Sequence, residues 1–267
     1  MPTVISKDST PIAFEKSGQG PVVILVAAAL SDRSDTKKLA ALLAEHFTVI
    51  NYDRRGRGES GDNPSYAVER EIEDIESLID EVGGPAFIFG SSSGAVLALE
   101  AANRLNGKIK KQVLYEPPLI VDDSQPPVSR GLRGQIAELI SANRRNDAVK
   151  LFFSKAMSIP AIGVFMMRFM PGWSKMRNMA HTTTYDLAIL EGAQDGKPLS
   201  RSRWEAAQLP TLVLTGEKSE AFFHNGARAL AGILPQAQHK ILKGQHHGSI
   251  VTAPNVIADE LLEFFSA

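Results

Sequence analysis

The sequence predicts an α/β fold in which helices cover both faces of a mostly parallel sheet. Short apolar runs alternate with helical patterns through residue 118 and again after residue 208. Such alternation is typical of parallel strands joined by helices. Between these two parts, residues 119–208 show helical patterns and no convincing strand. We therefore expect a sheet-based core that is interrupted by one helical insertion.

Each expected strand is a short apolar segment that ends at turn residues. The first two form a hairpin at one edge of the sheet. In chain order, the strands are expected at residues 3–6, 11–14, 22–26, 48–52, 86–89, 112–115, 211–214 and 239–242. The helices outside the insertion are expected at residues 35–45, 68–82, 95–102, 225–233 and 254–265. Asn106-Gly107 is expected to close the unit that follows the third of these helices.

A Gly-x-Ser-x-Gly motif at residues 90–94 separates an apolar run from an alanine-rich helical pattern. At such a motif the turn is so tight that its central residue, Ser92, takes a strained backbone conformation. A side chain at Gly90 or Gly94 would strike the neighbouring strand or helix. Ser92 would thus project at the carboxyl end of the sheet and at a helix N-terminus, where negative charge is favoured. In this setting the motif predicts a nucleophile, although the five letters alone also suit a plain turn.

Composition narrows the chemistry further. The 267 residues include no cysteine, which excludes disulfides, thiolate metal sites and a cysteine nucleophile. With 29 basic and 30 acidic residues and no basic stripe, nucleic-acid binding has no electrostatic basis. Neither a signal-peptide pattern nor an apolar stretch of about 18 residues is present. We expect a soluble, cytoplasmic protein with a small-molecule partner and no membrane or nucleic-acid partner, whereas the oligomeric state is left open.

The insertion is rich in methionine and phenylalanine. Six of the seven methionines lie there, and methionine adapts to irregular apolar shapes. Two interpretations stay open, which are ordinary packing of short helices and a lid that lines an apolar pocket over Ser92. The side chains concerned are Phe152, Phe153, Met157, Phe165, Met166, Met167, Phe169, Met170, Met176 and Met179.

These landmarks, in this order, resemble the α/β-hydrolase fold superfamily over nearly the whole chain. The matching pieces are the strand at residues 22–26, the run at 52–60, the motif at 90–94, and a late Gly-x-x-His at 244–247 with a proline after it. The resemblance implies an eight-stranded, mostly parallel sheet with a helical cap inserted after the sixth strand. Residues 1–118 and 209–267 would then form the hydrolase core, and residues 119–208 the cap.

The resemblance makes Ser92 the nucleophile and His247 the base. The chemistry independently requires such a pair, because a serine hydroxyl is a poor nucleophile until an imidazole can take its proton. His247 is preferred to His246 because the family usually places a small residue and then histidine after the glycine. Since His246 stands where the small residue is expected, it stays an alternative base.

The loop that would donate to an oxyanion also departs from the family pattern. The family commonly shows His-Gly before the donating residue, whereas this chain has Ala27-Ala28 and then Ala29. Alanine supplies a backbone N–H as well as glycine does. We therefore expect the amides of Ala29 and Ser93 to form the oxyanion hole, with a plain strand exit as the alternative.

The acidic partner of the histidine is less clearly specified. Many relatives carry an aspartate three residues beyond a glycine after the seventh strand, but this chain has Ser219 there. Glu116, just after the sixth strand, occupies the acid position that some members of the superfamily use instead. We favour Glu116, with Glu220 and Glu217 as alternatives and the absence of any acid as a further one.

Residues 53–60 form a run rich in glycine and arginine, Asp-Arg-Arg-Gly-Arg-Gly-Glu-Ser. The resemblance places Asp53 in the structural turn after the strand at residues 48–52. A phosphate-binding loop is the alternative, although no P-loop lysine and serine follow the glycines.

The leading hypothesis is a hydrolase that cleaves a small apolar ester or lactone through an acyl-enzyme intermediate and needs neither a metal nor an organic cofactor. A first alternative, motivated by Ser219 at the usual acid position, is a ligand-binding protein with little turnover. A second is cofactor-free haloperoxidase or perhydrolase activity, which is known in the superfamily. A dehalogenase is disfavoured because that chemistry needs a carboxylate in the place of Ser92.

Overall fold

A central sheet of eight strands runs through the protein in a computed structural model that describes residues 1–105 and 107–267. The spatial order is β1-β2-β4-β3-β5-β6-β7-β8, and all pairings from β4 onward are parallel, whereas β1 and β2 are antiparallel to their neighbours. This confirms the eight-stranded, mostly parallel sheet. The strands are β1 (Thr3–Ile5), β2 (Pro11–Ser17), β3 (Val22–Val26), β4 (Thr48–Tyr52), β5 (Ala86–Ser91), β6 (Ile109–Tyr115), β7 (Thr211–Gly216) and β8 (Ala237–Leu242).

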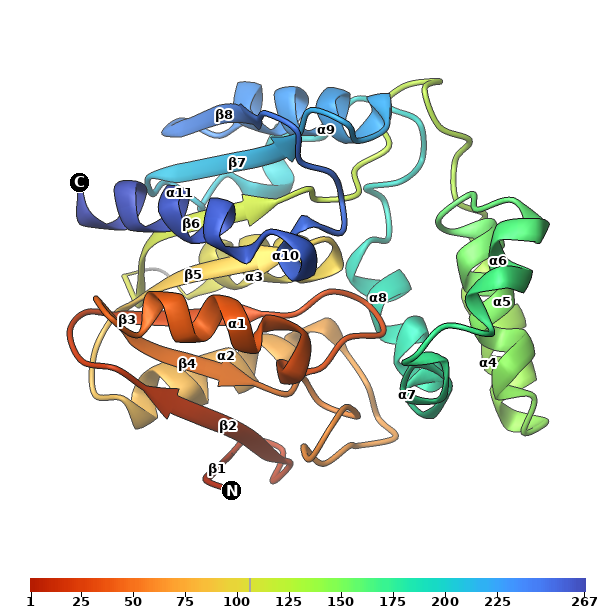
Figure 1. Ribbon diagram of the computed structural model, residues 1–267, viewed down its shortest axis with the longest axis horizontal. Coiled ribbons are helices and arrows are strands. Elements are labelled where there is room, and N and C mark those ends of the chain that lie inside the picture. The colour runs from red at the N-terminus through yellow and green to blue at the C-terminus, as the bar shows by residue number, and fades with distance from the viewer. Residues whose placement is uncertain (106) are drawn as a thin grey trace.

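Helices cover both faces of this sheet (Figure 1). On one face, α1 (Arg33–Leu43) and α11 (Pro254–Ser266) share an apolar cluster with β3, β4 and β6. On the other, α2 (Val68–Glu81), α3 (Ser93–Arg104) and α9 (Ala221–Ile233) pack against β3, β5 and β7 in a second cluster. Strand residues therefore contribute to both clusters, which explains why their segments are apolar without alternation.

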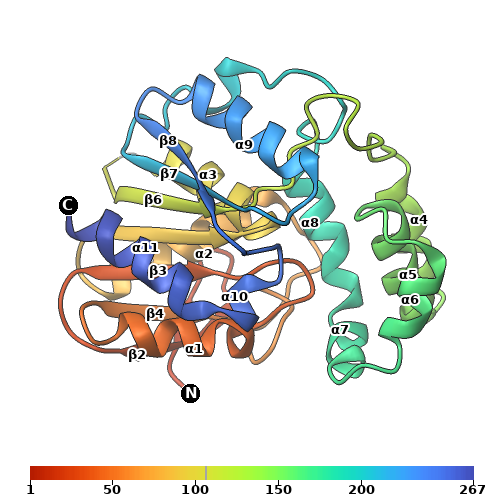
Figure 2. The same cartoon turned by 45° about the horizontal axis from the view of Figure 1, so that its top comes forward.

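The segment between β6 and β7 contains helices and no strand among its residues 119–208. Helices α4 to α7 stand beyond the carboxyl ends of the parallel strands, and α8 lies between them and the sheet (Figures 1 and 2). The helices are α4 (Leu132–Ser141), α5 (Arg145–Lys155), α6 (Ala161–Met167), α7 (Trp173–Asn178), η1 (Ala180–Thr182), α8 (Thr183–Ile189) and η2 (Arg201–Trp204). We call residues 119–208 the helical insert.

The helical insert packs in two ways. Its α4, α5 and α6 have an apolar cluster of their own, which Leu30 from the loop after β3 joins. In contrast, Ile189, Leu190, Ala193, Trp204 and Ala207 belong to the same cluster as the central strands. The division of the chain into core and cap at residues 118 and 208 stays a prediction.

The expected elements differ from the observed ones mainly at their ends. Helix α9 begins at Ala221, four residues earlier than expected, and the short helix α10 (Ser249–Thr252) was not expected. Gly107 has φ of 81°, as a residue that closes a helical unit can have, while Asn106 lies outside the described residues. Within the described residues, no helix combines the length and the apolar character that a membrane crossing requires.

Candidate active site

Ser92 occupies a sharp bend between β5 and α3. Its φ of 53° and ψ of −125° lie in a region that residues with a side chain rarely adopt. A Cβ at Gly90 would lie 2.3 Å from the carbonyl oxygen of Gly94, and one at Gly94 would lie 2.5 Å from the carbonyl oxygen of Ala27. The two glycines are therefore required where strand, helix and the neighbouring β3 approach one another, as the sequence predicts.

Glu116 follows β6 directly, and its carboxylate lies beside His247. The Nδ1 atom of His247 is 2.7 Å from Oε2 of Glu116. The other carboxylate oxygen, Oε1, accepts hydrogen bonds from the amide of Gly216, at 2.6 Å, and from the hydroxyl of Ser219. Glu116 is fully buried and has φ of 48°, a strained conformation for a residue other than glycine. The surroundings therefore hold this carboxylate in one orientation toward the imidazole.

The loop that carries His247 is itself held by its neighbours. The hydroxyl of Tyr115 donates to the carbonyl of His246 at 2.6 Å, and the amide of His246 donates to the hydroxyl of Ser249 at 2.9 Å. A Cβ at Gly216 would lie 2.4 Å from the backbone of Gln245, so β7 and this loop are in direct contact. The His246 side chain is exposed, and its Nδ1 accepts a bond from the amide of Gly248 within its own loop.

The two alternative acids have other surroundings. Oε2 of Glu217 accepts a hydrogen bond from the amide of Gly244 at 2.8 Å, which ties the end of β7 to the histidine loop. Glu220 is exposed at the N-terminus of α9 and lines the rim of the cavity described below. Among the described residues, Glu116 is the one whose carboxylate contacts the His247 ring.

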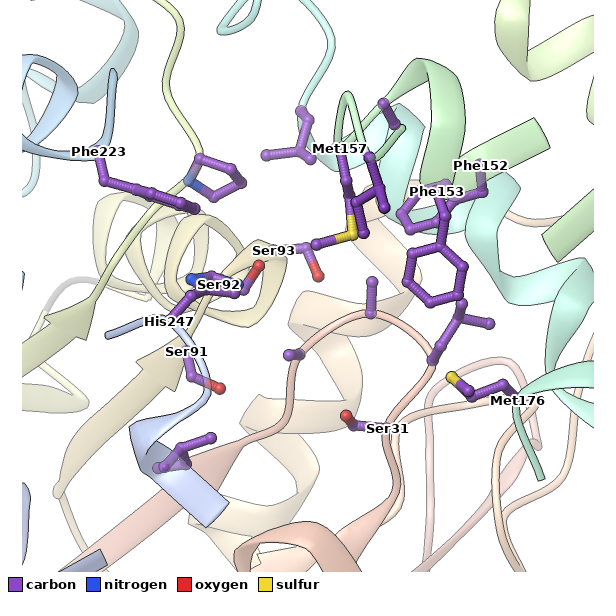
Figure 3. Close-up of a pocket in the computed structure, with 18 of the residues that line it drawn as sticks. Ser31, Ser91, Ser92, Ser93, Phe152, Phe153, Met157, Met176, Phe223 and His247 are labelled. Atoms are coloured by element: carbon purple, nitrogen blue, oxygen red, sulfur yellow. The ribbon is translucent and has the colours of Figure 1, made fainter. Parts of the chain in front are cut away.

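Ser92 and His247 line the same cavity, and their side chains lie next to each other in Figure 3. The ring of Phe223 stacks on the imidazole with 4.6 Å between ring centroids. Because Nδ1 of His247 faces Glu116, the remaining ring nitrogen, Nε2, is the one available to a hydroxyl in the cavity. The structure thus brings together Ser92, His247 and Glu116 from the ends of three strands.

The two expected oxyanion donors also lie at this cavity. Ala29 lines it from the loop after β3, and Ser93 is the first residue of α3. The first N–H groups of a helix have no partner within the helix and point to its N-terminus. The residue after Ala29, Leu30, has φ of 54°, so this loop, like the bends at Ser92 and Glu116, is conformationally strained.

The cavity has a volume of about 510 Å³ and a mostly apolar lining. Phe152, Phe153, Met157 and Met176 face it from the helical insert, opposite Ser92 (Figure 3). The lid interpretation was wrong for part of its residues. Phe165, Met166, Phe169 and Met170 are 49–72% exposed, because Val164 is the residue of α6 that is buried in the apolar cluster of the helical insert.

A sequence model described as the alpha/beta hydrolase family matches residues 23–260, which is most of the chain. The chain belongs to this family. The "Uncharacterized hydrolase YraK" of Bacillus subtilis (strain 168) is 27% identical to it over 243 residues, which cover 89% of this chain and 86% of that protein. These matches confirm the resemblance that the sequence motifs indicate.

Solved structures of alpha/beta hydrolases share the fold over the full chain. The crystal structure of an alpha/beta hydrolase from Sphaerobacter thermophilus DSM 20745 is similar with a TM-score of 0.91 and 46% identity, covering 99% of this chain and all of that one. The enol-lactonase from Burkholderia xenovorans LB400 is similar with a TM-score of 0.76 and 20% identity, and each chain covers 100% of the other.

In this alpha/beta hydrolase the arginine-rich run after β4 is structural. Arg54, Arg55 and Arg57 are at most 1% exposed, and each pairs with a carboxylate. Asp53 is buried and accepts hydrogen bonds from the amides of Arg33 and Glu59, at 2.9 and 2.8 Å. The structural turn is therefore confirmed, and the phosphate-loop alternative is wrong because the guanidinium groups already neutralise buried carboxylates.

Sequence reasoning missed Asp186, a fully buried residue of α8 that contacts Arg54, Arg57 and Ser93. One signal was present, since three arginines close together in a structural turn need buried carboxylate partners. The sequence does not show which of the 30 acidic residues supplies them. Within the described part of the chain, no cluster of three or more His, Asp or Glu side chains could hold a metal ion.

Asp62 joins the core to the helical insert and makes stability depend on pH. Partial burial raises the pKa of Asp62, but hydrogen bonds from His181 and Tyr185 outweigh this effect and lower the pKa below its usual value. A lowered folded-state pKa means that the stabilisation is complete above the pKa of an unfolded aspartate, about 3.9, and is lost as pH falls through the folded value.

We therefore expect the Tm of the wild type to fall steeply below about pH 4. Because asparagine does not titrate, Asp62→Asn should have a lower Tm at neutral pH and a shallower decline in acid. Calorimetry between pH 2.5 and 7 measures both curves. Asp259→Asn, at an exposed aspartate of α11, serves as the control and should follow the wild-type curve. Parallel curves for the wild type and Asp62→Asn would contradict the expectation.

Proposed function

We propose that this alpha/beta hydrolase cleaves a small apolar carboxylic ester or lactone through an acyl-enzyme intermediate. The observation that carries the proposal is the strained Ser92 beside His247, whose Nδ1 lies 2.7 Å from the buried Glu116 carboxylate. A hydroxyl, an imidazole and an orienting carboxylate form the arrangement that activates serine for attack on a carbonyl.

In the first half of the proposed reaction, the oxygen of Ser92 attacks the carbonyl carbon while Nε2 of His247 takes the hydroxyl proton. The amides of Ala29 and Ser93 would then stabilise the negative oxygen of the tetrahedral intermediate, a contribution of about 3 kcal/mol for each such donor. As the intermediate collapses, the ester C–O bond breaks and the leaving alkoxide takes the proton from His247. Glu116 stabilises the imidazolium that forms in between.

In the second half, His247 takes a proton from a water molecule, and the resulting hydroxide attacks the acyl-enzyme carbonyl. The bond to the Ser92 oxygen breaks, and that oxygen recovers the proton from His247. The carboxylic acid is released, and no electrons are exchanged with a cofactor. For a lactone substrate the alcohol and the acid stay parts of one molecule.

The cavity supports an apolar acyl group. Aromatic and methionine side chains of the helical insert lie opposite Ser92. Of the polar lining residues, Gln125 donates a hydrogen bond to Ser158, and Gln194 donates one to the carbonyl of Pro118. A volume of about 510 Å³ suits a small ligand. The Burkholderia enol-lactonase shares the fold, which is compatible with an ester or lactone but does not select between them.

The alternative of a ligand-binding protein depended on the lack of an acid at position 219, and Glu116 offers a carboxylate instead. Ser219 stands where relatives carry an acid, but its hydroxyl donates to Glu116, which lies against His247 in its place. A fluorophosphonate probe tests the proposal, because only an activated serine reacts with it. We expect one label per chain, on Ser92, and saturable hydrolysis of p-nitrophenyl acetate, butyrate and hexanoate. A folded protein without label and without turnover would support the binding protein.

A further inference from the structure

The fully buried carboxylate of Asp186 joins parts of the chain that are distant in sequence. It lies in α8, and its oxygens contact Nη1 of Arg54 at 2.9 Å, Nη2 of Arg57 at 2.9 Å and the hydroxyl of Ser93 at 2.7 Å. Arg54 has a second carboxylate partner in Glu71. For Arg57, Asp186 is the carboxylate partner that the described residues provide.

The same two arginines hold the loop that leads to Ala29. Nη1 of Arg54 donates to the carbonyl of Ala27 at 3.2 Å, and Nη1 of Arg57 donates to the carbonyl of Ala28 at 2.5 Å. One hydrogen bond therefore connects Asp186 to Ser93. Two hydrogen bonds, through Arg57, connect Asp186 to the peptide unit between Ala28 and Ala29, which contains the Ala29 amide. These are the two residues whose amides would form the oxyanion hole.

We propose that Asp186 is a positioning residue through which the helical insert places both oxyanion donors. The inference rests on the proposed function. Asp186 touches neither substrate nor reacting atoms. It acts by fixing Arg57 and Arg54 against the loop and by holding the Ser93 side chain at the start of α3. The insert thus has a role in the chemical step besides lining the cavity.

Charge is required for this role. A neutral carboxyl group could not balance two buried guanidinium groups, and an uncompensated buried charge is strongly destabilising. Burial alone would raise the pKa of Asp186, but the charges of Arg57 and Arg54 and the hydroxyl of Ser93 lower it below the usual value. The two guanidinium groups therefore favour the ionised form of Asp186.

The positions of the two amides matter because the stabilisation by an oxyanion hole depends on the distance between its donors and the oxyanion. Its donors must lie about 2.7–3.1 Å from the developing oxyanion, and loss of one donor costs about 10²–10³ in kcat. Displacement of a group by about 1 Å reduces the rate by about 10²-fold. Because the substrate carbonyl in the ground state depends less on these donors, a displaced donor should lower kcat and leave KM nearly unchanged.

The test compares two isosteric substitutions of buried aspartates. Asp186→Asn removes the charge that orders the two donor segments. Asp74→Asn is the control, because Asp74 is also fully buried on a helix and also pairs with a buried guanidinium group, that of Arg55, at 2.7 and 2.8 Å. Neither Asp74 nor Arg55 is among the described residues that line the cavity.

For Asp186→Asn we expect kcat for p-nitrophenyl butyrate to fall about 30- to 100-fold with KM within about twofold of wild type. Affinity for a trifluoromethyl ketone, whose adduct with serine carries an oxyanion, should fall by the same factor. For Asp74→Asn we expect a similar loss in Tm with kcat within about twofold of wild type. Equal kcat values in the two variants, measured at temperatures where both are folded, would overturn the inference.

Ser93→Ala decides the matter if Asp186→Asn does not fold. This change removes the hydroxyl that contacts Asp186 and keeps the backbone N–H. A drop in kcat of about tenfold at an unchanged Tm supports the inference, and an unchanged kcat overturns it. Wild-type protein that neither turns over ester nor reacts with fluorophosphonate refutes the proposed function, and this inference with it, whereas an active wild type with an equally active Asp186→Asn refutes the inference alone.

Discussion

Under the proposed mechanism, replacement of Ser92 by alanine is expected to reduce kcat for a p-nitrophenyl ester by on the order of 10⁶-fold, as removal of the nucleophilic serine does in subtilisin. The substitution deletes one oxygen and adds no volume, so the Tm should stay within a few degrees of wild type. Steady-state kinetics together with mass spectrometry after fluorophosphonate treatment measure both consequences, which are lost turnover and lost labelling.

The chain offers a matched control for this change in the preceding serine. Ser91 is the last residue of β5 and lines the same cavity, but it stands before the bend (Figure 3). Ser91→Ala should keep both the label and most of the turnover. Retention of turnover in Ser92→Ala would mean that another group carries the reaction, and it would remove the basis of the proposed mechanism.

Replacement of Glu116 by glutamine is expected to reduce kcat by several hundred-fold to about 10⁴-fold. The amide oxygen of glutamine can still accept from Gly216 and Ser219, which both bond Oε1 of the glutamate. The amide NH₂ then faces Nδ1 of His247 and donates to it. His247 is thereby forced into the tautomer with the proton on Nε2, which cannot accept the proton of Ser92.

The pH–rate profile and two further variants complete this test. Because His247 in this tautomer cannot act as the base, the residual activity of Glu116→Gln should depend on hydroxide and should rise toward alkaline pH more than that of wild type. Glu217→Gln and Glu220→Gln should stay within about fivefold of wild type, since neither carboxylate contacts the imidazole. A Glu116→Gln enzyme with full activity would show that the acid is misassigned.

The bend at Ser92 was predictable because it depends on local sterics. Gly90 and Gly94 leave the chain little choice at that turn, and the clashes that a Cβ would meet there involve the adjoining helix and the next strand of the sheet. The mostly parallel sheet was predictable for a similar reason. Apolar runs of strand length and the helices between them restrict how a parallel sheet can be connected.

The acid and the base were predictable only in part. Glu116 could be proposed because it ends a central strand, yet the preference over Glu217 and Glu220 came from resemblance. The structure shows two features that sequence spacing does not encode. The backbone of Glu116 is strained, and its Oε1 atom, which faces away from His247, accepts two hydrogen bonds. The orientation of His247 rather than His246 toward this carboxylate likewise depends on how the loop packs on Gly216.

Two further features escaped the sequence because they depend on which face of a helix meets the rest of the protein. The sequence gives no difference between Phe165 and Phe169 on the one hand and Phe152 and Phe153 on the other. Phe165 in α6 and Phe169 in the turn after it are exposed, whereas the pair in α5 lines the cavity. Asp186 lies in the short helix α8, and an aspartate in such a helix would ordinarily face water. Its burial follows from the arrival of Arg54 and Arg57 from a loop more than a hundred residues away.

By itself the sequence determined the sheet and the sharp bend at Ser92, because these depend on local backbone sterics and on the periodicity of apolar residues, and the resemblance of its motifs indicated the family. Only the tertiary structure decided which carboxylate lies against His247, which side chains line the cavity and that Asp186 joins the helical insert to Ser93. Those outcomes require groups from distant segments to meet within hydrogen-bonding distance, and that distance is a property of the packed chain alone.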